Sequence, residues 1–467
     1  MRKRFYILAY ISICLLDSSI CYAQQSKIDS LQSLLKKDKE DTNKVNHLGA
    51  IAWEYKFKAP DSSIKYGTLS LKLSQKVKWQ VGIGNSYHYL GEFNWRQGNS
   101  SLSLANYKQA LAIWDSLEKN IEPNRKAFIT NLKASTLSNI GVVNRNQGDY
   151  PKALDYDFKA LKTYEELQDK HGIAVIIGNI GLIYYNQGDY QKALDYYFKS
   201  LKKGEELGDK TLIATPLGNI GIVYNDQAIN SKSQTEGDSL FNKALEYYLK
   251  SLKMKEELGN KKGIGNTLGN IGSMYADEAQ KIKEDKSAKK ELLEQKALEY
   301  DFKALKIGEE LGDKNRITIQ FGNIGAVYTD SKKYAEAEKY LLQALAIDTT
   351  IGFLNHAKDT HEQLSKLYSQ TNRYQLALEH FKKAMTLKDS LFNADKNKEI
   401  TRKEMNYEFE KKEAAAAAVA EKEKAVASAE AQKQRVVLIL VSCFLILVVA
   451  FAGFILRALR ITQKQKH

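Results

Sequence analysis

Cysteine and proline are scarce in this chain, with three Cys and four Pro in 467 residues. Two of the cysteines, Cys14 and Cys21, lie in an apolar leader, and Cys443 lies in a long apolar run near the other end. The part between them holds no thiol, which excludes disulfide bonds and thiol catalysis there. The lack of proline favours long, uninterrupted helices.

Clustered basic charge is also missing, although the formal net charge is +14. The excess lysines are dispersed among glutamates, as in the segment KKGEE at 202–206, and no arginine cluster is present. Such dispersal is typical of solvated helix faces rather than of a nucleic-acid surface. We therefore expect no nucleic-acid partner.

No catalytic or metal-binding motif is convincing. The segment GIGNTLGNIG at 263–272 imitates a phosphate-binding loop but lacks the preceding strand that such a loop needs. His356 and His361 are five residues apart, off a common helical face, and the pair His361-Glu362 has no second His to complete a zinc motif. We expect no catalytic residue, no metal and no cofactor, and hence a protein that is not an enzyme.

What the sequence contains instead is a repeated unit, whose clearest copy covers residues 179–218. The tripeptide N-I-G starts copies 40, 40, 51 and 53 residues apart. A weaker copy starts near Gln363, and two degenerate copies lie around Leu48-Gly49 and Leu90-Gly91, which gives eight units. Self-similarity at this period indicates a solenoid. The clear copies start at Asn139, Asn179, Asn219, Asn270 and Asn323.

Within one unit the spacing predicts a helix, a turn and a second helix. Small residues recur where two helices must cross closely, and aromatic residues recur where they would fill the gap, as with Gly181 and Tyr197. Gly188-Asp189 would end the first helix and begin the second, and Gly208-Asp209 would do the same between units.

This pattern resembles the tetratricopeptide repeat family over about three quarters of the chain. Its carriers in the seventh unit are Gly325, Tyr328, Ala337, Leu341 and Ala344. The resemblance implies an all-α fold, a right-handed α-solenoid of about eight helix-turn-helix units. The departures are the long period and two aspartates, Asp157 and Asp301, where the family has an aromatic residue.

Two insertions lengthen the fifth and sixth units at the turn inside each unit. The first, 228–238, is rich in Ser, Thr and Gly and is expected to form a loop. The second, 280–291, is charged and is expected to lengthen the flanking helices. Both would project from one edge of the solenoid, either as a rim for a partner or as solvated decoration.

The ends of the chain predict export and membrane anchoring. Residues 1–23 form a basic and then apolar segment ending in Ala23, typical of a cleaved signal peptide, and 24–44 would form an N-terminal cap before the solenoid at 45–392. Residues 393–435 predict a long charged Ala/Glu/Lys helix, for which a homodimeric coiled coil and a lone stalk both remain open.

The uncharged run at 436–456 predicts one transmembrane helix, followed by a short basic tail at 457–467. Lysine and arginine counts on its two sides are nearly tied, so the export signal decides the orientation. We expect a single-pass inner-membrane protein whose repeats are periplasmic or extracytoplasmic and whose C-terminal tail is cytoplasmic.

The asparagines that open the N-I-G motifs are the candidate binding residues. In repeats of the resembled family the first helix lines a concave groove, so these amides would form a ladder along it. An amide both donates and accepts hydrogen bonds, which suits the backbone of an extended peptide, but the same side chains could instead bond a neighbouring helix. Groove neighbours that would set ligand preference are Arg145, Asn146, Tyr185, Asn186, Asn225 and Asp226.

The order of parts also resembles the sensory half of membrane sensor histidine kinases of the Bacteroidetes type, whose connecting helix is similar to 388–412. We favour a non-enzymatic, membrane-anchored module that binds a peptide or protein for signal transduction. A second hypothesis is a truncated or split sensor kinase, because the sequence holds no ATP-binding motif. Its catalytic half would then be lost, or supplied by a separate cytoplasmic kinase or output protein. A third is a scaffold for envelope complexes.

Overall fold

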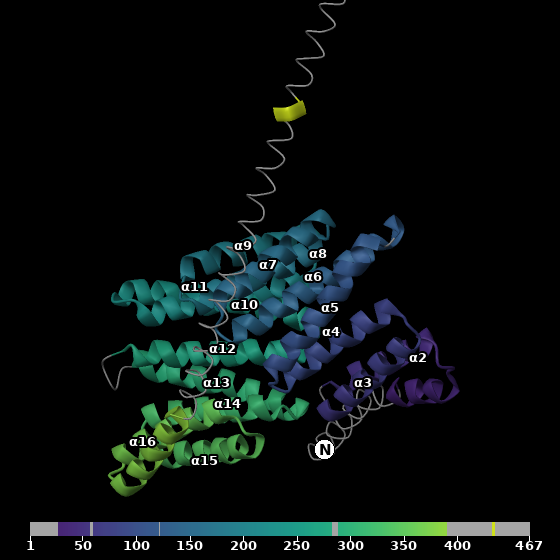
Figure 1. The fold of residues 1–467 in the computed structure, drawn as a ribbon. Coiled ribbons are helices and arrows are strands. Elements are labelled where there is room, and N and C mark those ends of the chain that lie inside the picture. Colours follow the sequence, from purple (N-terminus) through teal and green to yellow (C-terminus); the bar gives the residue numbers. More distant parts are fainter. Residues whose placement is uncertain (1–26, 57–58, 121, 283–287, 390–431, 435–467) are drawn as a thin grey trace, which may run out of the picture. The chain divides into compact units, whose positions relative to one another are not determined.

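The computed structural model describes residues 27–56, 59–120, 122–282, 288–389 and 432–434 (Figure 1). The chain divides after Ser390 into two compact units. The first unit holds the helical array, and the described residues of the second, 432–434, are helical.

Helices follow one another in pairs through the first unit, and the described residues include eight such pairs, as the repeats predict. A helical segment at 27–37 precedes them, close to the expected cap. The pairs are α2 (Thr42–Tyr55) with α3 (Pro60–Lys76), α4 (Gln80–Arg96) with α5 (Ser100–Asn120), α6 (Pro123–Asn146) with α7 (Tyr150–Glu166), α8 (Lys170–Asn186) with α9 (Tyr190–Leu207), α10 (Lys210–Asn230) with α11 (Gln234–Glu257), α12 (Lys261–Gln280) with α13 (Ala288–Leu311), α14 (Lys314–Asp330) with α15 (Tyr334–Ile351), and α16 (Leu354–Gln370) with helical residues 374–389.

The even-numbered helices form the inner face of the array. Each helix from α2 to α15 contacts the next along the chain, and each even-numbered helix also contacts the next even-numbered one, from α2 to α16. No such contact joins the odd-numbered helices among the described residues. We call the even-numbered helices the inner helices, because they contact their counterparts in the neighbouring pairs.

Close packing within the pairs α8/α9 and α10/α11 depends on a glycine in the inner helix and a tyrosine in the outer one. A Cβ atom on Gly181 of α8 would lie 2.8 Å from Cδ1 of Tyr197 on α9, and one on Gly221 of α10 would lie 2.7 Å from Cδ1 of Tyr248 on α11. Tyr197 packs further against Ile220 of the next unit, so the core continues from one pair to its neighbour.

The turns confirm the expected roles of glycine and aspartate. Gly188 has φ +79° and Gly208 has φ +64°, values that glycine adopts without steric cost. Asp189 accepts a hydrogen bond from the backbone amide of Lys192, and Asp209 accepts one from that of Thr211. Each aspartate thus satisfies a free amide at the start of a helix.

The loop expected at 228–238 is wrong. Helix α10 continues to Asn230 and α11 begins at Gln234, so only 231–233 separate the helices. Lys281 of the next unit donates to the carbonyl oxygens of Ala228 and Ser231, at 2.8 and 2.7 Å, which satisfies the free carbonyls at the end of α10. The Ser hydroxyl at 233 caps α11.

In the second insertion α13 begins at Ala288, which confirms the lengthened outer helix.

Asp157 and Asp301 lie where three other units place a tyrosine and the seventh unit places Leu341, and both aspartates are buried. Their exposed fractions are 1% and 0%, and each carboxyl lies directly against a glycine of its inner helix, Gly141 or Gly272. Burial raises the pKa of Asp157 to about 8, although the nearby Arg145 opposes this shift. Burial also raises the pKa of Asp301 well above its ordinary value.

Several expected segments lie outside the described residues: the leader at 1–23, the long helix at 393–435 apart from 432–434, the span at 436–456 and the tail at 457–467. Within the described ranges, no helix is both long and apolar enough to span a bilayer.

Candidate functional site

The five N-I-G asparagines stand one per inner helix, on α6, α8, α10, α12 and α14, and each is partly exposed. Three of them bond the preceding inner helix. The Nδ2 atom of Asn179 lies 3.5 Å from Oγ of Ser138, and that of Asn323 lies 3.1 Å from Oγ of Ser273. Asn139 lies 3.4 Å from Nε2 of His88. These three amides join neighbouring repeats.

Asn219 and Asn270 differ from the other three. Neither side chain makes a hydrogen bond to another residue in the part of the chain that the structure describes. They follow one another on α10 and α12, two inner helices in contact. In the predicted ladder, the asparagines on α6, α8 and α14 are therefore bonded to neighbouring repeats. The two asparagines between them, on α10 and α12, have unused hydrogen-bond donors and acceptors.

The glycine before four of these asparagines has a packing explanation. A Cβ on Gly178 would lie 3.2 Å from Oγ of Ser200, and one on Gly218 would lie 3.2 Å from Oγ of Ser251. In later units the same position faces Gln320 or His356. Glycine inside a helix costs about 1 kcal/mol relative to alanine. Close side-chain packing accounts for glycine at these positions.

Arg145, near the end of α6, is largely buried but has only a neutral partner. Its guanidinium donates to Oδ1 of Asn146 at 3.3 Å, and no carboxylate lies within ion-pair distance among the described residues. Burial lowers its pKa, against the opposing effects of Asp157 and Tyr197. A partly buried cation of this kind can accept an anionic group from a ligand.

Tyr185 and Asn225 connect successive inner helices rather than standing free. The Tyr185 hydroxyl of α8 donates to Oδ2 of Asp226 on α10 at 2.7 Å. The Nδ2 atom of Asn225 donates to Oδ2 of Asp277 on α12 at 3.0 Å. Burial raises the pKa of both aspartates, Asp226 and Asp277. Asn186, beside Tyr185, is exposed.

These bonds reveal an acidic row that the sequence analysis named only in part. Asp226, Asp277 and Asp330 each lie five residues after the N-I-G glycine, on α10, α12 and α14. Asp330 accepts from Gln280 at 3.0 Å and from Lys366 at 2.7 Å. Aligning the units on N-I-G places these aspartates at the same position of each unit, so the sequence alone could have predicted the acidic row.

The two histidines considered for metal binding have different hydrogen-bond partners. His356 Nδ1 lies 2.7 Å from Oδ2 of the buried Asp348. His361 Nδ1 lies 2.8 Å from Nδ1 of His380, and both rings are nearly buried. The described residues contain no cluster of three or more His, Cys, Asp or Glu side chains that could hold a metal ion.

The family model for the tetratricopeptide repeat matches residues 132–203 and 315–390. Among solved structures, aspartyl phosphate phosphatase F from Bacillus subtilis is 14% identical, with a TM-score of 0.52 over 80% of this chain and 92% of that one. The apo form of the quorum sensor NprR from B. thuringiensis is 16% identical, with a TM-score of 0.50 over 77% of this chain and 91% of that one. No curated protein matches. At these identities the likeness shows a helical repeat solenoid and not an activity.

Proposed function

We propose that the array is a non-enzymatic interaction module whose inner face binds an extended segment of a peptide or protein. The observation that carries this proposal is the pair Asn219 and Asn270, partly buried on adjacent inner helices with no bonding partner in the described structure. Leaving a partly buried amide unpaired costs free energy unless water or a ligand supplies the partner. A peptide backbone offers a matching donor and acceptor at each residue.

The charges of the inner face indicate which ligand it would prefer. Asp226 on α10 and Asp277 on α12 have neutral partners, Tyr185 and Asn225, and Arg145 on α6 likewise has a neutral partner. Asp330 on α14 is already paired with Lys366. A ligand lying along the inner helices would therefore place basic side chains toward α10–α12 and an acidic group toward α6. Such complementarity sets orientation and specificity more than affinity.

Selection from a displayed library of random peptides on the full-length protein tests the proposal. Selected peptides should bind the Asn219→Ala/Asn270→Ala double variant more weakly, by roughly tenfold for each lost hydrogen bond of about 1.4 kcal/mol. Asn106→Ala on the outer helix α5 is the matched control, because its amide bonds the Leu102 carbonyl of its own helix and no other residue within the described ranges. Equal binding by the double variant and the control would refute the groove as the binding site.

We also propose that the module is anchored in a membrane with its repeats outside the cytoplasm, and that it serves signalling. The supports are the leader at 1–23 and the apolar run at 436–456. Protease added to intact spheroplasts should digest the repeats and spare an epitope placed after His467. Protection of the repeats together with exposure of the epitope would reverse the proposed orientation.

A further inference from the structure

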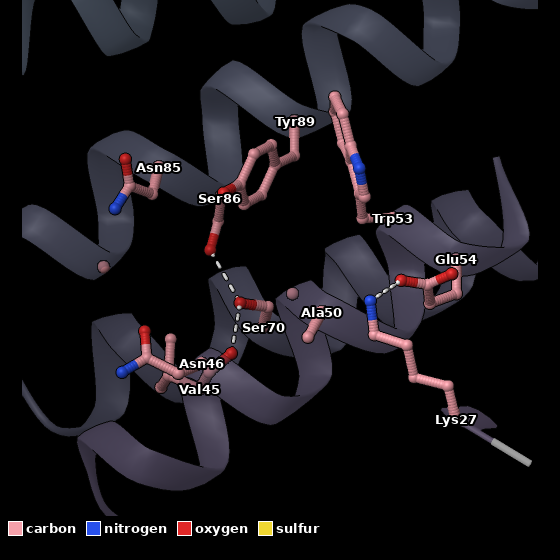
Figure 2. A pocket seen from close by; sticks show the side chains of 12 residues that line it. Lys27, Val45, Asn46, Ala50, Trp53, Glu54, Ser70, Asn85, Ser86 and Tyr89 are labelled. Carbon is pink, nitrogen blue, oxygen red and sulfur yellow. Dashed lines mark hydrogen bonds and ion pairs between the residues drawn. The ribbon is translucent and has the colours of Figure 1, made fainter. Parts of the chain in front are cut away.

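A pocket of about 390 Å³ lies between the inner helices α2 and α4, in the first two units (Figure 2). None of the residues named in the predicted groove belongs to it. Its volume is at the lower end of the range for small-ligand sites, which suits one amino-acid side chain with its flanking backbone. The side chains that define it are Asn46, Trp53, Ser70, Asn85, Ser86 and Tyr89.

The floor of the pocket has no unused polar group, whereas one wall does. Ser70 donates to the Val45 carbonyl at 3.1 Å, and its Oγ lies 2.9 Å from Oγ of Ser86. Asn46 of α2 and Asn85 of α4 are labelled on the same side of this pair in Figure 2. Neither amide makes a hydrogen bond to any described residue. Two amides from adjacent inner helices are thus open to a ligand: Asn85 is partly buried and Asn46 is exposed, and neither stands at the N-I-G position that Asn219 and Asn270 occupy.

The other side of the pocket is aromatic, with charged side chains beside the rings. The rings of Trp53 and Tyr89 lie 5.7 Å apart between centroids, at 50° to each other, and Trp53 keeps 39% of its surface exposed. Lys27 and Glu54 form an ion pair of 2.6 Å beside them. The Lys56 ammonium lies 3.1 Å from the centroid of the Trp53 ring, so part of the indole already has a cationic partner. What the pocket offers a ligand is therefore the Tyr89 ring, the remaining indole surface and the two amides.

We propose that this pocket is a subsite for one aromatic residue of the bound peptide, with Asn46 and Asn85 holding the backbone of that residue. The proposal rests on the proposed function and adds to it where on the array the ligand is anchored and by which class of side chain. The partner would therefore be an extended segment that carries an aromatic residue toward α2–α4.

One glycine in the pocket allows a test in which misfolding is not a concern. A Cβ on Gly49 would lie 3.5 Å from Cε2 of Tyr89 and 3.8 Å from Oγ of Ser70, which are ordinary contacts. Gly49 is also inside α2, where alanine favours the helix. Gly49→Ala should therefore leave the fold at least as stable while it narrows the pocket.

The experiment uses the full-length protein with N-acetyl-L-phenylalaninamide as probe and N-acetyl-L-alaninamide as reference, observed by saturation-transfer NMR. We expect saturable binding of the aromatic probe with a dissociation constant on the order of 1 mM, and tenfold weaker binding of the reference. The Asn46→Ala/Asn85→Ala variant should lose roughly tenfold of the affinity for the aromatic probe for each lost hydrogen bond, and Gly49→Ala should lose about tenfold. The Asn219→Ala/Asn270→Ala variant should bind the probe as the wild type does.

Equal binding of the two probes, or unchanged binding by both pocket variants, would overturn the subsite. Probe binding that arises only after residues before Lys27 are removed would also overturn it, because this chain's own leading segment would then be the occupant. Failure of the proposed function has a different signature: the aromatic probe binds in the expected way, but no selected peptide depends on Asn219 and Asn270.

Discussion

Replacing the buried Asp157 by Asn should stabilise the array at neutral pH. Asp157 lies on α7, with 1% of its surface exposed and its carboxyl against Gly141, and burial raises its pKa to about 8 from an ordinary 3.8. Asn has nearly the same shape and no charge to bury. The substitution therefore removes the cost of keeping an ionisable group in this position.

The direction and size of the effect follow from proton linkage. Because the folded state holds the proton more tightly, the contribution of Asp157 to stability is present in full below about pH 4 and is lost as pH rises through about 8. At pH 7 the loss is bounded by 7 minus 3.8 pH units at 1.36 kcal/mol each, or about 4 kcal/mol. Asp157→Asn should recover up to this amount at pH 7 and almost none at pH 4.

The assay is the thermal midpoint of unfolding of the wild type and the variant, measured from about pH 4 to pH 9. The wild-type midpoint should fall across this range relative to that of the variant. Asp155→Asn is the matched control on the same helix, because Asp155 is partly exposed and paired with Lys159 at 2.7 Å. Its effect should stay within about 0.5 kcal/mol. A difference between wild type and Asp157→Asn that does not change with pH would refute the reasoning.

Three further predictions concern contacts of the inner helices and of the last pair. Gly221→Ala should destabilise the array by about 1–3 kcal/mol in denaturant unfolding, because the added Cβ would lie 2.7 Å from the Tyr248 ring. Tyr185→Phe should raise the pKa of Asp226 further, since it removes a donor 2.7 Å from Oδ2; a lower pKa by NMR titration would contradict this. Burial and its histidine neighbour lower the pKa of His361 to about 4, so stability present above pH 6.5 should be lost as pH falls through about 4. A ring signal of His361 titrating near 6.5 would contradict this prediction.

Much of the fold could be predicted because each unit repeats the same local chemistry. The N-I-G motif located five units and the weaker copies of the pattern located three more. Gly188 with Asp189 located a turn correctly, since positive φ and an N-cap are local demands. The expected loop at 228–238 was wrong for a non-local reason. Lys281, more than fifty positions further on, bonds the end of α10 and lets both helices extend into the insertion.

The candidate site was harder to predict because sequence position does not tell which amides are already bonded. Asn179 and Asn219 are alike in the alignment, yet only Asn179 has a partner in the described structure, Ser138 of the preceding inner helix. The residue before the motif is glycine in both units, so this residue does not explain why only one of the two asparagines is bonded. The explanation lies in the side chain that the preceding inner helix offers, which is Ser138 in the case of Asn179. Asn46 and Asn85 were missed because they do not stand at the N-I-G asparagine position, which His47 and Tyr89 hold in their units.

The central claim, that the inner face binds a ligand, is tested most directly by site-specific photocrosslinking in native membranes. One probe replaces Asn219 on the inner helix α10, and a control probe replaces Lys202, an exposed residue of the outer helix α9. The account predicts an adduct from Asn219 alone, whose mass identifies the ligand as a peptide or protein. Adducts from Lys202 alone, or from neither position, would contradict it.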